Sequence, residues 1–212
     1  MRKKSAVSCL FLDIGGVLLT NGWDHYARKR AAARFKLDWA EMDERHHLNF
    51  DTYEMGKISL DEYLDRGVFY RKRPFTRSAF RNYIFAQSNA LPGMIELMGR
   101  LKAHHGLKIA VVSNEGRELN AYRIRRFKLD GLVDFFISSC FVHLRKPDAE
   151  IFRLALDIAQ ESTEKIIYVE NTPLFVRVAE GFGIRSILHQ DYDSTAAKLA
   201  SFGLTDRVGN KS

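Results

Sequence analysis

The stretch Val7–Thr20, VSCLFLDIGGVLLT, joins a short apolar run to an aspartate and two glycines. An apolar run without polar alternation is typical of a strand in a parallel sheet that is buried on both faces. The sequence therefore predicts a buried strand over Val7–Leu12. Asp13 would lie at its carboxyl end, and Gly15 and Gly16 would let the following backbone approach a ligand closely.

Similar apolar runs recur further along the chain, separated by helical patterns. The runs are Leu107–Val112, Val133–Ser138, Ile166–Val169 and Ile184–Leu188, and the helical patterns are Ile95–Ala103, Arg117–Phe127, Asp148–Gln160 and Leu174–Glu180. Strands that alternate with helices in this way predict a doubly wound parallel α/β sheet with a Rossmann-like core.

Residues 20–88 interrupt this rhythm, since they contain no convincing strand. They predict four helices, over Asp24–Phe35, Ala40–Phe50, Ser59–Val68 and Thr76–Gln87. Ser59 followed by Glu62 is typical of a capping box at a helix start. We expect a core domain made of residues 1–19 and 89–212, with a helical cap domain, residues 20–88, inserted after the first strand. Leu91–Gly93 would be the return hinge.

The composition is that of a globular protein. The 212 residues are 46% hydrophobic and 28% charged, close to average values. The apolar runs are shorter than the ~18 residues that a membrane span needs, and the basic N-terminus lacks a signal-peptide cleavage site. We expect a cytoplasmic protein, a monomer or homodimer without a membrane partner, in which Cys9 and Cys140 are buried thiols.

The chain is basic, with 33 Lys and Arg against 26 Asp and Glu, a formal net charge of +7. Acidic residues interleave with most basic clusters, as on a solvated helix face. No zinc-finger, KH or RRM signature is present. We therefore expect surface charge that steers anionic substrates, and no nucleic-acid partner.

Polar residues follow four of the predicted strands or their loops. They are Asp13, then Ser113 and Asn114, then Lys146, then Glu170 and Asn171. Ligands of parallel α/β sheets bind at the carboxyl ends of the strands. Each of these residues alone would also fit a turn, a helix cap or surface charge. Their joint placement at one sheet edge favours a functional site.

This set of residue types suits phosphoryl transfer. The carboxylate of Asp13 can attack phosphorus and form an aspartyl-phosphate. Ser113 and Lys146 can hold the oxygens that carry charge in the transition state. Glu170 and Asn171 offer the oxygen ligands that Mg²⁺ prefers.

Four motifs in this order resemble those of the haloacid dehalogenase-like (HAD) hydrolase superfamily: FLDIGGVLL, VVSN, RKPD and YVEN. The helical insert lies where that superfamily carries a C1 helical cap, and YEMGKISLDEYL resembles the cap of its sugar-phosphate phosphatases. Within that superfamily the chain resembles the α-D-glucose-1-phosphate phosphatase-like group. The resemblance implies a Mg²⁺-dependent phosphatase of a small phosphorylated metabolite, with a sugar phosphate as the expected substrate.

The resemblance also implies roles for single residues. Asp13 would be the nucleophile, and its carboxylate and the Gly15 carbonyl would bind Mg²⁺. Ser113 and Asn114 would contact the phosphate, and Lys146 would neutralise its charge. Asn171 would be the direct metal ligand of its pair, with Glu170 behind it or reaching in with its longer side chain.

Two positions depart from the family pattern. Gly15 stands where most of these phosphatases have an aspartate for general acid–base catalysis, which is worth about 10²–10⁴-fold. We therefore expect a leaving group that departs readily, such as an anomeric phosphate, or a substitute acid among Asp24, His25 and Glu115. Asn171 replaces an acid, which predicts weaker Mg²⁺ binding.

Alternative functions stay open at this point. A 2-haloacid dehalogenase of the same superfamily needs neither the second aspartate nor a metal. A catalytically impaired HAD domain would bind a phosphorylated ligand or partner without turnover.

The cap residues that set specificity would come from a group of large or cationic side chains: Trp23, Tyr26, Tyr53, Arg77 and Arg81. We expect two histidine pairs, His46–His47 and His104–His105, to lie on helix surfaces, the second of them just before Gly106 and away from the predicted cleft.

Overall fold

A five-stranded parallel sheet forms the centre of the molecule. The computed structural model describes residues 7–205, so the basic N-terminal start lies outside the described residues. The strands are β1 (Cys9–Leu12), β2 (Lys108–Ser113), β3 (Phe135–Ser138), β4 (Ile166–Glu170) and β5 (Arg185–Leu188). Their order is β3-β2-β1-β4-β5, with Leu12 beside Val111 on one side and Val169 on the other. The predicted doubly wound sheet is confirmed.

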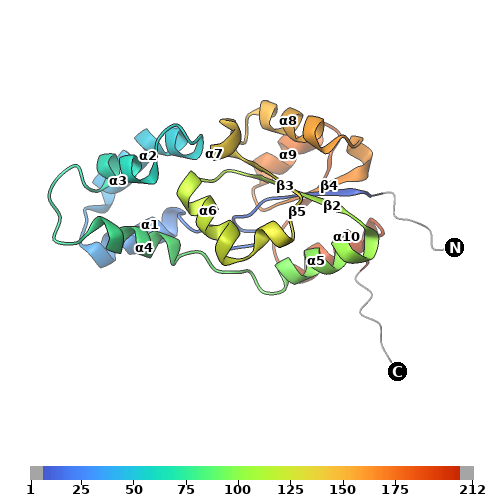
Figure 1. Ribbon diagram of the computed structural model, residues 1–212, viewed down its shortest axis with the longest axis horizontal. Coiled ribbons are helices and arrows are strands. Elements are labelled where there is room, and N and C mark those ends of the chain that lie inside the picture. Colours follow the sequence, from blue (N-terminus) through green and yellow to red (C-terminus); the bar gives the residue numbers. More distant parts are fainter. Residues whose placement is uncertain (1–6, 206–212) are drawn as a thin grey trace, which may run out of the picture.

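Helices cover both faces of the sheet (Figure 1). Helices α5 (Met94–His105) and α10 (Tyr192–Ser201) pack on one face, and α8 (Ala149–Ala159) and α9 (Pro173–Gly181) on the other. Leu10 and Leu12 point to the first face and Phe11 to the second. Burial on both sides explains why the strands are apolar throughout. The thiols of Cys9 and Cys140 are free and buried, as expected.

Four helices follow β1 and lie together at one end of the molecule (Figure 1). They are α1 (His25–Phe35), α2 (Trp39–Glu54), α3 (Leu60–Gly67) and α4 (Arg77–Phe85). These helices share a hydrophobic cluster that includes Trp23, Leu64 and Phe80. The capping box of Ser59 and Glu62 is present. Helix α2 runs one turn beyond its predicted end because Tyr53 and Glu54 are buried.

The last turn of α2 contacts the core beside α7 (Ser139–Val142). Ser139 Oγ donates to the Glu54 carbonyl oxygen at 2.7 Å. Arg145, in the loop after α7, pairs with Glu54 at 2.8 Å and with Asp51 at 2.7 Å. These bonds seat the helical insert on the loop that carries Lys146.

A buried arginine hydrogen-bonds to both of the chain segments that connect the insert to the core. Arg123 lies on α6 (Arg117–Arg126). Its Nε donates to Ser88 Oγ at 3.1 Å and its Nη2 to the Thr20 carbonyl oxygen at 3.2 Å. Its Nη1 pairs with Glu115. Because Thr20 and Ser88 lie at opposite ends of the insert, one guanidinium holds the two connecting segments together.

Two short 3-10 turns, Leu129–Gly131 and Thr163–Lys165, complete the connections. Within residues 7–205, every helix is too short or too polar to cross a membrane.

Candidate active site

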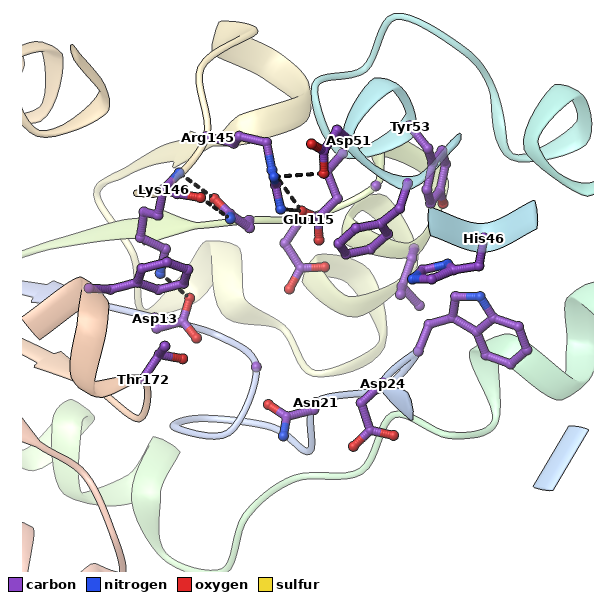
Figure 2. Close-up of a pocket in the computed structure, with 18 of the residues that line it drawn as sticks. Asp13, Asn21, Asp24, His46, Asp51, Tyr53, Glu115, Arg145, Lys146 and Thr172 are labelled. Atoms are coloured by element: carbon purple, nitrogen blue, oxygen red, sulfur yellow. Dashed lines mark hydrogen bonds and ion pairs between the residues drawn. The ribbon is translucent and has the colours of Figure 1, made fainter. Parts of the chain in front are cut away.

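A cavity of about 530 Å³ opens between the carboxyl edge of the sheet and the helical insert. Figure 2 shows Asp13 and Lys146 on the core side and His46 and Tyr53 on the opposite side. The cavity therefore brings together the strand-end residues expected from the sequence and side chains from the insert.

Lys146 is almost fully buried and uses its ammonium to join two strand ends. Its Nζ donates to Asp13 Oδ1 at 2.8 Å and to Glu170 Oε2 at 2.6 Å. A third bond reaches Tyr168 Oη at 3.0 Å. Asp13 and Glu170 meet there because β1 and β4 are neighbours in register. No sequence pattern pointed to Tyr168 as a site residue, because it lies inside an apolar strand.

The charges in this cluster depend on one another. Burial alone would lower the pKa of Lys146, but the carboxylates of Asp13 and Glu170 outweigh it and raise that pKa above its usual value. Lys146 therefore stays charged. Burial also raises the pKa of Asp13, and the nearby Glu170 adds to this, while Lys146 opposes it. A further cation at the site would favour the ionised, nucleophilic form of Asp13.

Asn114 positions the loop that carries Lys146. Its Oδ1 accepts from the Lys146 backbone N–H at 2.8 Å, and its Nδ2 donates to the Lys146 carbonyl oxygen at 2.8 Å. The Asn114 amide, which was expected to contact phosphate, is thus hydrogen-bonded to the backbone of Lys146. Ser113 lies close to the Asp13 carboxylate: its Oγ accepts from the backbone N–H of Ile14 at 3.4 Å, and its hydroxyl favours the ionised forms of both Asp13 and Glu115.

Glu170 and Asn171 differ in how far they are free to bind a metal. Both Glu170 oxygens are in use, because Oε2 accepts from Lys146 and Oε1 accepts from the Thr172 N–H at 2.8 Å. The side-chain oxygen of Asn171 faces only acceptors, 2.9 Å from Glu170 Oε1 and 3.2 Å from the Gly15 carbonyl oxygen. Turned over, the amide nitrogen would donate to both.

The amide of Asn171 can turn either end towards the site. With its nitrogen inward it donates to Glu170 Oε1 and the Gly15 carbonyl oxygen, and with its oxygen inward it can bind a hard cation. With the carboxylate of Asp13, the carbonyl of Gly15 and the amide of Asn171, the site offers the oxygen donors suited to Mg²⁺. The described residues contain no cluster of three or more His, Cys, Asp or Glu arranged for a metal, so a site here depends on the neutral oxygens of Gly15 and Asn171.

The three candidate substitute acids lie in different surroundings. Glu115 is buried at the cavity wall. Asp24 also lines the cavity, but its Oδ1 caps α1 by accepting from the Ala27 N–H at 2.7 Å. His25 is exposed and packs against Trp39, with ring centroids 5.0 Å apart. Of the three, Glu115 is the buried carboxyl group.

The candidate specificity residues fall into two groups, those that line the cavity and those that lie elsewhere on the insert. Trp23 and Tyr53 line the cavity. Tyr26 is 70% exposed, and Arg77 and Arg81 form ion pairs with Asp65 and Asp61 elsewhere on the insert.

The expectation that both members of the His46–His47 pair lie on the surface was wrong. His47 is exposed, but His46 is buried against the cavity. Consecutive helix residues point in different directions, and His46 shares its face with Phe50 and Tyr53, at the spacing of an apolar stripe. That spacing was the one sequence pattern that could have predicted the burial of His46. His104 and His105 lie at the outer surface, as expected.

A hydrogen-bond chain holds His46 in its neutral form. Trp23 Nε1 donates to Tyr63 Oη at 3.0 Å, and Tyr63 Oη lies 2.7 Å from His46 Nδ1. A Tyr63 hydroxyl that accepts from Trp23 donates to His46, which leaves His46 Nε2 as the protonated nitrogen. Burial, with the nearby positive charge of Arg28, lowers the pKa of His46 to about 3.

His46 should make the folded protein sensitive to mild acid. The unfolded chain takes up a proton near pH 6.5 and the folded protein only near pH 3. This contribution to stability is therefore present above pH 6.5 and is lost as the pH falls towards the folded value. In denaturant titrations, we expect wild type to lose on the order of 1–3 kcal/mol of unfolding free energy between pH about 7 and about 4.5 from this group.

The variant His46→Asn should lack this part of the pH dependence, because its amide can still accept from Tyr63 but does not titrate. His47→Asn, at the exposed neighbour, should keep it. If the unfolding free energy depends on pH equally in the two variants, His46 is not the group that causes the loss of stability in acid.

Comparisons with known proteins identify the family. Residues 7–183 match the haloacid dehalogenase-like hydrolase family. PpaX, a candidate pyrophosphatase of Caldanaerobacter subterraneus, is 29% identical over 92 residues, 43% of this chain and 41% of PpaX. Chloroplast flavin mononucleotide hydrolase 1 of Arabidopsis thaliana is 24% identical over 164 residues, 77% of this chain and 66% of that protein. Each match spans less than two thirds of the relative's length.

Solved structures share the fold. The HAD family enzyme bt-2542 of Bacteroides thetaiotaomicron, in complex with magnesium and inorganic phosphate, superposes with a TM-score of 0.71 at 18% identity. The superposition covers 87% of this chain and 95% of that enzyme. Since the family match extends over most of the sequence, the chain belongs to the haloacid dehalogenase-like hydrolases.

Proposed function

We propose that this hydrolase is a Mg²⁺-dependent phosphatase of a small phosphorylated metabolite that acts through an aspartyl-phosphate on Asp13. One observation carries the proposal: the Asp13 carboxylate lies at the cavity, 2.8 Å from the buried ammonium of Lys146. The names of PpaX and the flavin mononucleotide hydrolase, and the phosphate held by the bt-2542 structure, support phosphate chemistry.

The chain's own residues divide the work of the first step. The free oxygen of Asp13 attacks phosphorus, while Lys146 orients its partner oxygen and offsets the negative charge of the incoming phosphate. The hydroxyl of Ser113, close to the Asp13 carboxylate, can donate to a phosphoryl oxygen. Asn114 holds the Lys146 loop in position through two backbone bonds. Bound by Asp13, Gly15 and Asn171, Mg²⁺ would supply additional positive charge beside the phosphate.

The test is a panel of sugar phosphates and nucleotides, assayed for phosphate release with and without Mg²⁺. We expect release that stops in EDTA. Chloride release from a 2-haloacid that continues in EDTA would instead make the chain a dehalogenase. Vanadate binding without turnover of any substrate would make it an impaired binding domain.

We expect a preference for anomeric phosphates over phosphates of simple alcohols. The acid usual at position 15 is missing, and an anomeric leaving group depends less than a simple alcohol on a proton from any substitute acid. The ratio of kcat/KM for glucose 1-phosphate over glucose 6-phosphate should be at least about tenfold. A preference for the 6-phosphate would contradict the proposed substrate class while leaving the phosphatase chemistry in place.

The variant Asn171→Asp should bind Mg²⁺ more tightly. A carboxylate adds a full negative charge where the wild type offers an amide oxygen, and we expect the dissociation constant to fall by about tenfold. Calorimetric titration and the Mg²⁺ dependence of phosphate release would both report it. Asn89→Asp, which adds the same charge at an exposed residue, is the matched control. Equal affinities in the two variants would remove Asn171 as a ligand.

A further inference from the structure

Glu115 is a buried carboxyl group beside the candidate nucleophile that the chemistry above does not use. It follows β2 directly after Asn114 and is only 2% exposed, yet it lines the cavity. Figure 2 shows its carboxylate pointing into the cavity between Asp13 and the side chains of the insert. The Ser113 hydroxyl favours the ionised forms of both Glu115 and Asp13, so both carboxyl groups lie near this one hydroxyl.

Arg123 lies close to both Gly15 and Glu115. A Cβ built on Gly15 would lie 3.8 Å from Arg123 Nη1. That same Nη1 forms the ion pair with Glu115 Oε1. A side chain at position 15 would thus lie beside Asn21 and within reach of the guanidinium that holds the Glu115 carboxylate. Glu115 therefore presents an acid on the side of the nucleophile where residue 15 has none.

The surroundings of Glu115 also point to a ligand with a hydroxylated leaving group. Tyr53 packs over the next residue, Gly116, where an added Cβ would lie 2.4 Å from the Tyr53 hydroxyl. This hydroxyl is buried and, among the described residues, has no hydrogen-bond partner. A buried hydroxyl without a partner is destabilising, and a bound hydroxyl group at the cavity would provide that partner.

We propose that Glu115 is the general acid, and then the general base, of the phosphatase reaction. The inference rests on the proposed function. In the first step an Asp13 oxygen bonds to phosphorus, the bond from phosphorus to the leaving oxygen breaks, and that oxygen takes the proton of Glu115. In the second step water attacks phosphorus and gives a proton to Glu115, the bond between phosphorus and Asp13 breaks, and inorganic phosphate leaves.

The electrostatics of Glu115 suit this cycle. Burial raises the pKa of Glu115 above its ordinary value, while Arg123 and, more distantly, Lys146 oppose the rise. An acid–base group works best when both forms are accessible near the working pH. Arg123 keeps the carboxyl group in place and limits the rise, so Arg123 is a positioning residue for Glu115.

The substitution Glu115→Gln tests the proposal, because the amide keeps the size and can still accept from Arg123 but carries no transferable proton. With p-nitrophenyl phosphate, whose leaving group needs no acid, the first step should survive and the second should slow. We expect a rapid burst of about one p-nitrophenolate per protein, followed by a kcat reduced about 10²–10³-fold. With glucose 6-phosphate, whose leaving alcohol needs the proton, no burst should appear.

Controls separate chemistry from folding. Glu44→Gln, at an exposed residue of α2, should behave as wild type. Thermal unfolding monitors the fold, and if the Gln variant does not fold, Glu115→Asp takes its place. Its shorter side chain should slow the hydrolysis of glucose 6-phosphate more than that of p-nitrophenyl phosphate. A uniform loss on both substrates without a burst, or no loss, would overturn the proposal. A wild type that releases no phosphate from any substrate would instead contradict the proposed function.

Discussion

Replacing Asp13 with Asn should lower kcat for phosphate release by about 10⁴-fold or more, on every substrate that wild type hydrolyses. The amide has nearly the size of the carboxylate but cannot attack phosphorus. Lys146 keeps Glu170 as a partner at 2.6 Å, so the buried cation stays paired and the fold should persist. Steady-state phosphate release, with circular dichroism to verify folding, measures the effect.

The matched control for this variant is Asp157→Asn, the same change at an exposed residue of α8, which should keep wild-type activity. Activity of Asp13→Asn within tenfold of wild type would mean that another group forms the bond to phosphorus.

Removing Lys146 should have the largest effect on stability. In Lys146→Met, the buried carboxylates of Asp13 and Glu170 lose their shared cation. Breaking a buried pair from one side costs about 3–5 kcal/mol, which lowers the melting temperature of a chain of this size by roughly 6–20 °C. Activity should be lost as well, because the phosphate loses its fixed positive charge.

A second substitution tells an electrostatic cause from a packing defect. Adding Glu170→Gln to Lys146→Met removes one unpaired carboxylate, so the double variant should recover part of the lost stability. A double variant that is less stable by the full sum of the two single losses would show that the carboxylates are not the source of the penalty.

Much of the fold was predictable because its signals are local. Parallel strands buried on both faces need uninterrupted apolar runs, and those runs are legible around Asp13 and in the four later segments. The convergence of Asp13, Lys146 and Glu170 followed from the same logic, since neighbouring parallel strands end at one edge. The start of α3 was predictable from the bonding between Ser59 and Glu62.

Other features depend on contacts that no local pattern reveals. Arg123 belongs to a basic run typical of a solvated surface, yet it is buried because it lies one helical turn after Leu119 and faces the crossings at Thr20 and Ser88. His46 was expected at the surface because the tilt of α2 was unknown. The commitment of Asn114 to the Lys146 backbone required the two loops to be seen together.

The most direct test of the covalent mechanism is to identify the phosphorylated residue itself. Wild-type protein is mixed with substrate, quenched in acid within one turnover and reduced with borohydride, which converts an aspartyl-phosphate into homoserine. Peptide mass spectrometry should then find homoserine at position 13 and an unchanged carboxyl group at Glu170. Active protein that carries no modification at position 13, or carries it on another residue, would contradict the proposed nucleophile.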